Sequence, residues 1–139
     1  MTEIEQRFFD LTNVQRHRGR LLPLVEAQTL TIAAHRHSED MLRRRFFGHV
    51  NPDRKTHADR IDAVLKWKSG QTAENIWMRS GPVTKANIAR VVDEAIAQLM
   101  ASRHHRANIM SRVYTHLGMG VALTASEVRV TQLFARFER

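Results

Sequence analysis

The chain has 139 residues, of which 42% are hydrophobic and 26% charged, and this size and composition are typical of a folded domain rather than a disordered chain. It holds 22 Lys and Arg against 14 Asp and Glu, a formal net charge of +8, which favours contact with anionic surfaces and says nothing about the fold. It has no cysteine, which excludes disulfides, thiolate metal sites and a cysteine nucleophile. No linker or internal repeat divides the chain, so we expect one domain over residues 1–139.

The first third of the chain predicts two helices. The face of the first carries Ile4, Phe8, Leu11 and Val14, and Gly19 ends it. Residues 25–45 predict a second, long amphipathic helix. Its apolar face is a row at i, i+3 and i+4 spacing: Leu30, Ala33, Ala34, His37 and Met41. We therefore expect His37 to be a hydrogen-bonded core residue rather than a ligand.

The middle of the chain predicts a short helix, a strand and a further helix. Thr56 and Asp59 have the spacing of a capping box at the start of the short helix. Residues 72–78 predict a strand. After the turn at residues 80–82, Thr84 is a candidate N-cap for a helix that closes near His104 and His105. That helix has the cleanest apolar stripe in the sequence: Ile88, Val91, Val92, Ala95, Ile96, Leu99 and Met100.

The C-terminal third changes to a period of two. Apolar residues alternate along residues 117–123 and again along residues 128–134, with a short turn between them. This pattern predicts an antiparallel hairpin. Together with residues 72–78 it predicts an α+β sandwich, in which a small, mainly antiparallel, three-stranded sheet is covered by about four helices.

Among the eight histidines, His49 is the first candidate for a site, because it follows the aromatic pair Phe46-Phe47 in a Gly-His-Val-Asn-Pro loop. Of the adjacent His104 and His105, only one side chain can point inward. No zinc-binding His-Glu-x-x-His, nucleophile elbow or glycine-rich phosphate loop is present. Two imidazoles and a carboxylate from distant segments would suit zinc, and spacing alone leaves that possibility open.

Several segments, taken in order, resemble motifs of the bacterial CAP superfamily (cysteine-rich secretory protein, antigen 5 and pathogenesis-related domains). The segments that resemble it most closely are His37-Ser38-Glu39-Asp40-Met41, Phe46-Phe47-Gly48-His49, Asp59-Arg60-Ile61, Ala73-Glu74-Asn75-Ile76, Ser102-Arg103-His104-His105-Arg106-Ala107-Asn108-Ile109, and the two closing strands. Ala73 stands where the family usually has glycine. The resemblance covers nearly the whole chain.

This resemblance implies an α-β-α sandwich with a central cleft. The family's cleft histidines and glutamate carry over to His49, Glu74 and His105, with Asn75 and Ser102 beside them. In the family the cleft can hold a divalent cation such as zinc or magnesium, which would here be bound by His49, Glu74 and His105. Members are linked to lipids, sterols or other partners. Eukaryotic members have a second glutamate three residues after a tryptophan, and those positions are Ser102 and Leu99 here.

Three functions follow as hypotheses. The first is a binding module whose His/Glu cleft recognises a ligand or a protein partner, with or without a metal. The second is a basic protein that binds anionic lipid or polysaccharide, although Arg43–Arg45 are explained more simply as cations at a helix C-terminus. The third is a metal-assisted hydrolase in which His49 and His105 bind a cation and Glu74 is the general base. A packing role for the three side chains stays open beside them.

The surroundings in which the protein acts are inferred from the resemblance, which implies an extracytoplasmic or secreted location. Residues 1–6 do not have the pattern of a signal peptide, so a cytoplasmic location stays open. No apolar run approaches the length of a membrane span. No specific nucleic acid is expected as a partner.

Overall fold

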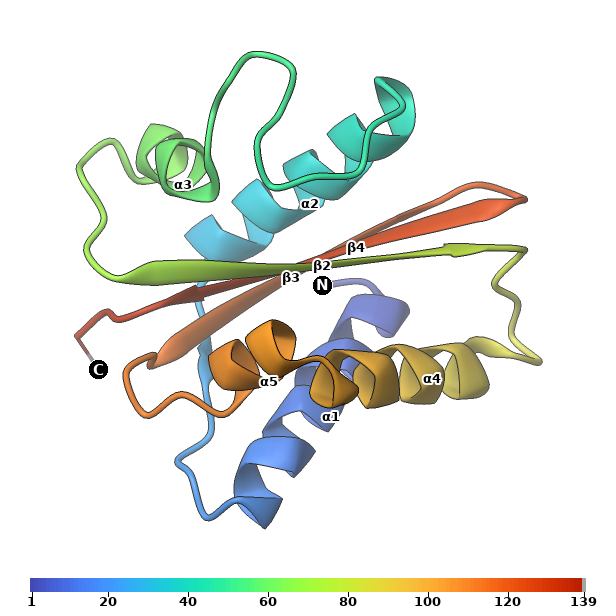
Figure 1. Ribbon diagram of the computed structural model, residues 1–139, viewed down its shortest axis with the longest axis horizontal. Helices are drawn as coiled ribbons and strands as arrows, with labels where there is room; N and C mark the ends of the chain where they lie inside the picture. Colours follow the sequence, from blue (N-terminus) through green and yellow to red (C-terminus); the bar gives the residue numbers. More distant parts are fainter. Residues whose placement is uncertain (139) are drawn as a thin grey trace.

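The computed structural model describes residues 1–138 and arranges them in three layers (Figure 1). A four-stranded sheet lies in the middle, with α2 and α3 on one face and α1, α4 and α5 on the other. The elements in chain order are α1 (Glu3–Arg18), β1 (Val25–Glu26), α2 (Gln28–Arg43), α3 (His57–Leu65), β2 (Thr72–Ser80), α4 (Ile88–Ala101), α5 (Arg103–Ile109), β3 (His116–Leu123) and β4 (Glu127–Ala135). The predicted α+β sandwich is confirmed, but the described chain has five helices and four strands rather than about four and three.

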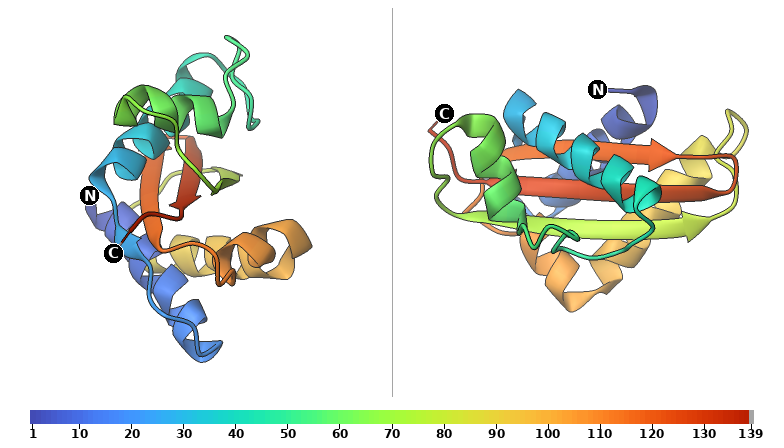
Figure 2. Two further views of the ribbon diagram at one scale, coloured as in Figure 1. Left: turned by 90° about the vertical axis from the view of Figure 1, so that its left-hand side faces the viewer. Right: turned by 90° about the horizontal axis from the view of Figure 1, so that it is seen from above.

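The sheet has the strand order β1-β3-β4-β2. β3 and β4 form the predicted antiparallel hairpin, β2 is antiparallel to β4, and β1 is parallel to the start of β3. The sequence prediction missed β1 because its two residues, Val25 and Glu26, are both exposed and too few to show a period. β2 is an edge strand, and the loop between α2 and α3 runs alongside it (Figure 2, right).

The register determines which face each site residue occupies. Glu74 lies opposite Leu133, which packs with α2 and α3, so Glu74 points to that face of the sheet. Asn75 lies opposite Gln132, which is level with Met119 on the face covered by α1 and α4. Successive side chains of a strand point to opposite faces. Glu74 and Asn75 are adjacent in the chain but therefore lie on opposite faces of the sheet.

α2 and α3 follow their sequence patterns closely, whereas α1 departs from its pattern. Every residue of the predicted row on α2 is buried, and Thr56 and Asp59 form the predicted capping box. In α1, however, Val14 is exposed, and Thr12 and Arg16 are buried. Arg16 donates hydrogen bonds to the carbonyls of Ile109 and Ser111 at 2.9 and 2.7 Å. A long polar side chain can thus be buried when its donors are satisfied, which a count of apolar residues misses.

The last predicted helix is divided in two. The backbone of Ser102 is extended (φ −93°, ψ 125°), which ends α4 and starts α5 in a new direction. His105 is consequently half-buried while His104 is exposed. The start of α4 also differs, because its N-cap is Asn87 rather than Thr84. Within residues 1–138, no helix has the length and apolar character needed to cross a lipid bilayer.

Two glycines of β3 allow α2 to lie directly on the sheet. A Cβ added to Gly120 would be 2.2 Å from the backbone of Ala34, and one added to Gly118 would be 2.2 Å from the backbone of Leu30. Such contacts are with backbone atoms, which cannot move aside as a flexible side chain can. Close packing of α2 also lets Ser38 donate a hydrogen bond to the carbonyl of Gly120 at 2.8 Å.

We expect the substitution Gly120→Ala to lower the free energy of unfolding by about 3 kcal/mol, because α2 must move off the sheet to admit the methyl group. The measurement is urea unfolding followed by circular dichroism. Gly70→Ala is the matched control, since a Cβ at Gly70 has open space around it, and it should change stability by less than about 0.5 kcal/mol. Equal effects of the two substitutions would contradict the close packing of α2 on β3.

Candidate functional site

Glu74 is the buried centre of a charged network that joins β2, α3 and the loop after α2. Its side chain is 0% exposed. The Arg60 guanidinium donates to both carboxylate oxygens, from Nη1 to Oε2 at 2.8 Å and from Nη2 to Oε1 at 3.0 Å. His49 Nδ1 donates to Oε1 at 2.9 Å. Paired hydrogen bonds of this kind between Arg and a carboxylate fix orientation as well as charge.

The same arginine fixes the loop that carries His49. Arg60 Nη2 also donates to the backbone carbonyl of His49 at 2.7 Å. His37, on α2, donates from Nε2 to the carbonyl of Gly48 at 2.9 Å and packs its ring edge-on against Phe46. His37 is therefore the hydrogen-bonded core residue that the sequence predicted, and its task is to hold the loop.

The carboxylate of Glu74 is held in its ionised form. Burial by itself raises the pKa of Glu74, but hydrogen bonds from His49 and Arg60 and the charge of Arg60 outweigh burial, so the pKa is lowered from its ordinary value. Burial lowers the pKa of His37, more than the nearby charge of Glu74 raises it. The lowered pKa favours the neutral form of His37, and Arg60 is the guanidinium cation that pairs with the buried carboxylate.

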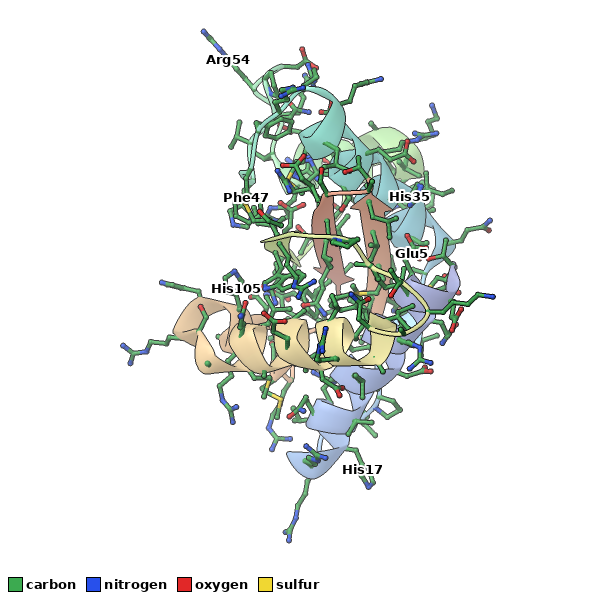
Figure 3. The ribbon with its side chains drawn as sticks, turned by 90° about the vertical axis from the view of Figure 1, so that its right-hand side faces the viewer. Glu5, His17, His35, Phe47, Arg54 and His105 are labelled. Carbon is green, nitrogen blue, oxygen red and sulfur yellow. The ribbon has the colours of Figure 1, made fainter. Side chains whose placement is uncertain are left out.

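His105 lies on the other side of the sheet edge and does not contact Glu74. Its Nδ1 is hydrogen-bonded to Ser102 Oγ at 2.8 Å. Burial lowers the pKa of His105, and the neighbouring His49 and His104 lower it further. In Figure 3, Phe47 and His105 lie on the two sides of the sheet edge.

Asn75, on β2, holds α5 in position through hydrogen bonds of its side chain. Its Nδ2 donates to the carbonyl of His105 at 3.0 Å and to Gln132 Oε1 at 3.1 Å, and its Oδ1 accepts from Asn108 at 2.9 Å. The side chain is almost fully buried. Asn75 therefore holds the backbone of His105 in place and does not line the cleft itself.

A cleft of about 530 Å³ lies between these two halves. Three of the five predicted site residues line it, namely His49, Ser102 and His105, whereas Glu74 and Asn75 lie behind its wall. The rest of the lining is mostly apolar or aromatic: Phe47, Gly48, Ile76, Trp77, Met78, Gln98 and Leu99. This volume and this mixture of an apolar surface with a few polar groups are typical of a ligand site.

The three side chains proposed as metal ligands do not meet in one place. Within residues 1–138, no group of three or more His, Asp or Glu side chains could hold a metal ion. Both oxygens of Glu74 already accept hydrogen bonds from Arg60, whose positive charge disfavours a second cation beside it. As arranged here the donor set does not fit zinc or magnesium. The metal site stays a prediction.

A second cavity, of about 420 Å³, lies between α2 and α3. Among the described residues, Arg60 and His37 line this second cavity, beside Asp40 and Ala63, and do not line the first cleft. Arg60 reaches the second cavity while it is bound to Glu74.

Comparison with known proteins identifies the family. The model of the cysteine-rich secretory protein family, CAP, matches residues 9–134. The chain belongs to this family. It is 31% identical over 124 residues to the uncharacterized protein YkwD of Bacillus subtilis, and 32% identical over 123 residues to the uncharacterized membrane protein YlbC of the same organism. These alignments cover 88% and 86% of this chain but only 44% and 32% of the relatives, so the CAP chain spans less than half of their length.

Solved structures share the CAP fold. An extracellular protein containing an SCP domain from Bacillus anthracis superposes with a TM-score of 0.80 at 30% identity, over 96% of this chain and 40% of that one. An outer surface protein of Borrelia burgdorferi, at 18% identity, superposes with a TM-score of 0.77 over 99% of this chain and 95% of that one. The second similarity concerns the fold alone.

Sequence reasoning missed Arg60, which is the residue that contacts most of the network. It was part of the Asp59-Arg60-Ile61 motif, but no role was assigned to it. A signal was present: Arg60 is one turn into the short helix after the capping box, next to the core residue Ile61. His57, on α3, is half-buried, and burial lowers its pKa more than nearby Glu74 raises it.

We expect Arg60→Met to lower the free energy of unfolding by about 3 kcal/mol at pH 7, because it leaves the Glu74 carboxylate buried without its cation. The double variant Arg60→Met/Glu74→Met should lose less, since the unpaired charge is gone. Arg7→Met is the control, because Arg7 pairs with Glu3 on the exposed face of α1 at 3.7 Å, and it should cost less than about 0.5 kcal/mol. If Arg60→Met and Arg7→Met cost the same in urea unfolding, the network does not hold the site together.

Proposed function

We propose that this CAP domain is a binding module whose cleft, at the free edge of β2, takes a ligand with an apolar body and an anionic or hydrogen-bond-accepting group. The observation that supports this is the composition of the cleft, where aromatic and aliphatic side chains surround two imidazoles. His49 and His105 come from opposite walls, so a single polar group between them can be recognised from both sides. Phe47 and Trp77 offer flat apolar surfaces next to it.

Hydrolysis is less well supported by the same geometry. A general base must reach a water molecule and must take up its proton near neutral pH. Glu74 is fully buried, bound by Arg60 through both oxygens and held at a lowered pKa. It is therefore suited to orienting His49 and not to accepting a proton from the cleft.

The arginine run at residues 43–45 offers no separate observation in favour of polyanion binding. Arg44 pairs with Asp40 at 2.6 Å and with Asp53 at 3.0 Å, and Arg43 pairs with Asp40 at 3.3 Å. These hydrogen bonds to Asp40 and Asp53 raise the pKa of Arg44. Two of the three consecutive arginines are thus engaged within the loop and at the end of α2.

We propose further that the domain acts outside the cytoplasm. Support comes from the solved structure at 30% identity, which is that of an extracellular protein. The chain has no cysteine, so its fold needs no disulfide and tolerates either redox environment.

We expect indole-3-acetate, an aromatic carboxylate, to bind the cleft with a dissociation constant of about 1 mM, the affinity typical of about 13 non-hydrogen atoms. The chain supplies its own control in NMR titrations, because Trp77 lines the cleft and is 7% exposed, whereas Trp67 does not line it and is 66% exposed. The Trp77 signal should shift and the Trp67 signal should not. Binding should tighten as the pH falls, because an anion favours the protonated form of His105.

Two variants test the location of this binding. Ser102→Leu fills the cleft and should weaken binding about tenfold. Ala63→Leu fills the cavity between α2 and α3 and should leave the affinity unchanged. Saturable shifts that spare Trp77, or equal affinity in wild type and Ser102→Leu, would refute the cleft as the binding site.

A further inference from the structure

The free edge of β2 directs a set of backbone groups into the cleft. At the two ends of the strand, Arg136 N donates to Gln71 O at 3.0 Å and Gly81 N donates to Ser126 O at 2.7 Å. Hydrogen-bonded and non-hydrogen-bonded pairs alternate along an antiparallel ladder, and the register is continuous from Thr72 to Ser80. The odd-numbered residues of β2 therefore bond to β4, and the even-numbered residues direct their N–H and C=O groups away from the sheet.

Ile76 and Met78 are the even-numbered residues that line the cleft. The carbonyl of Glu74, two residues earlier, has Asn108 Nδ2 at 3.5 Å, in agreement with an outward direction. Within residues 1–138, the outward N–H and C=O groups of Ile76 and Met78 form no hydrogen bond. The outward N–H and C=O groups of an edge strand are a template for pairing with another chain, so these four groups are available to an occupant of the cleft.

The edge is recessed, which restricts what can pair with it. Ile76 is 6% exposed and Met78 is 40% exposed. In Figure 3, Phe47 lies on one side of the edge and His105 on the other, and His49, two residues after Phe47, also lines the cleft. A second sheet brings its own covering layers and cannot enter between these walls, whereas one extended strand, about 4.8 Å from β2, can.

We propose that the cleft binds an extended acidic peptide segment of a partner protein, which adds to the sheet as a strand beside β2 and pairs with Ile76 and Met78. This inference rests on the proposed function, because it uses the same cleft. Strand addition takes its affinity from main-chain hydrogen bonds and its specificity from alternate side chains. Acidic side chains suit the cleft because α5, which carries His105, also carries the exposed basic residues Arg103, His104 and Arg106, and the chain has a net charge of +8.

The test uses the blocked peptide acetyl-Glu-Val-Glu-Val-Glu-amide and two backbone-methylated forms of it, one N-methylated at the glutamates and one at the valines. Only one edge of an added strand faces β2, so one methylated peptide should bind about tenfold more weakly and the other should bind like the parent. Amide hydrogen exchange shows which individual N–H groups of β2 are hydrogen-bonded. In the free protein Asn75 and Trp77 should be protected and Ile76 and Met78 should exchange fast, and the parent peptide should protect Ile76 and Met78.

A variant of the protein tests the same bonds from the other side. Met78→Pro removes an outward N–H group without touching the ladder to β4, and proline is tolerated at such positions on edge strands. Met78→Thr keeps the N–H group and is the matched control. We expect Met78→Pro to lose about tenfold in affinity for the parent peptide and Met78→Thr to lose less than twofold. Should Met78→Pro not fold, the methylated peptides on wild-type protein decide the question.

Three results would overturn strand addition. The first is equal binding by the parent and both methylated peptides, and the second is no binding of the parent peptide at 1 mM. In either of those cases, a Trp77 shift with indole-3-acetate would show that the proposed function survives, and its absence would show that both fail. The third is concentration-dependent protection of Ile76 and Met78 without peptide, which would assign the edge to a second copy of this chain.

Discussion

The pairing of Arg60 with Glu74 is the interaction on which the rest of the site depends. Glu74 is a fully buried carboxylate on an edge strand, and a charge in that position is tolerated only with a well-placed partner. Arg60 supplies two hydrogen bonds to it and a third to the backbone of His49. One side chain thus connects α3, β2 and the loop after α2, which together form one wall of the cleft.

The two walls of the cleft are built by different means. On the first, charge and buried hydrogen bonds position His49. On the second, a break in helical geometry at Ser102 positions His105, and the amide of Asn75 holds the backbone of His105. The edge of β2 runs between them with apolar side chains. The carboxylate is paired behind the wall and the imidazoles line the cleft, an arrangement that supports the binding role we propose.

Most of the fold could be predicted from the sequence because its elements repeat a pattern. The α2 row and the β3–β4 alternation each place several residues on a buried face, so a single exception does not hide them. β1 could not be predicted from two exposed residues, nor could the break at Ser102, which depends on one backbone conformation. At the site, family motifs gave His49, Glu74 and His105, but no pattern shows that Glu74 and His105 face opposite sides of β2. Glu74 points to the α2–α3 face because side chains alternate along β2 and because the register places Glu74 opposite Leu133. Arg60 was missed because its partner is 14 residues away, on another element.

The most direct test of this account is the pKa of Glu74, measured by NMR from the side-chain carboxyl ¹³C shift as the pH is lowered, with Glu74→Gln used for assignment. The account predicts a titration midpoint below about 4.3, the ordinary value for glutamate, because hydrogen bonds from His49 and Arg60 outweigh burial. A midpoint near 6 would mean that burial prevails and that Glu74 carries a proton in the range where a general acid or base operates. That result would contradict a carboxylate locked by Arg60 and would favour catalysis over binding.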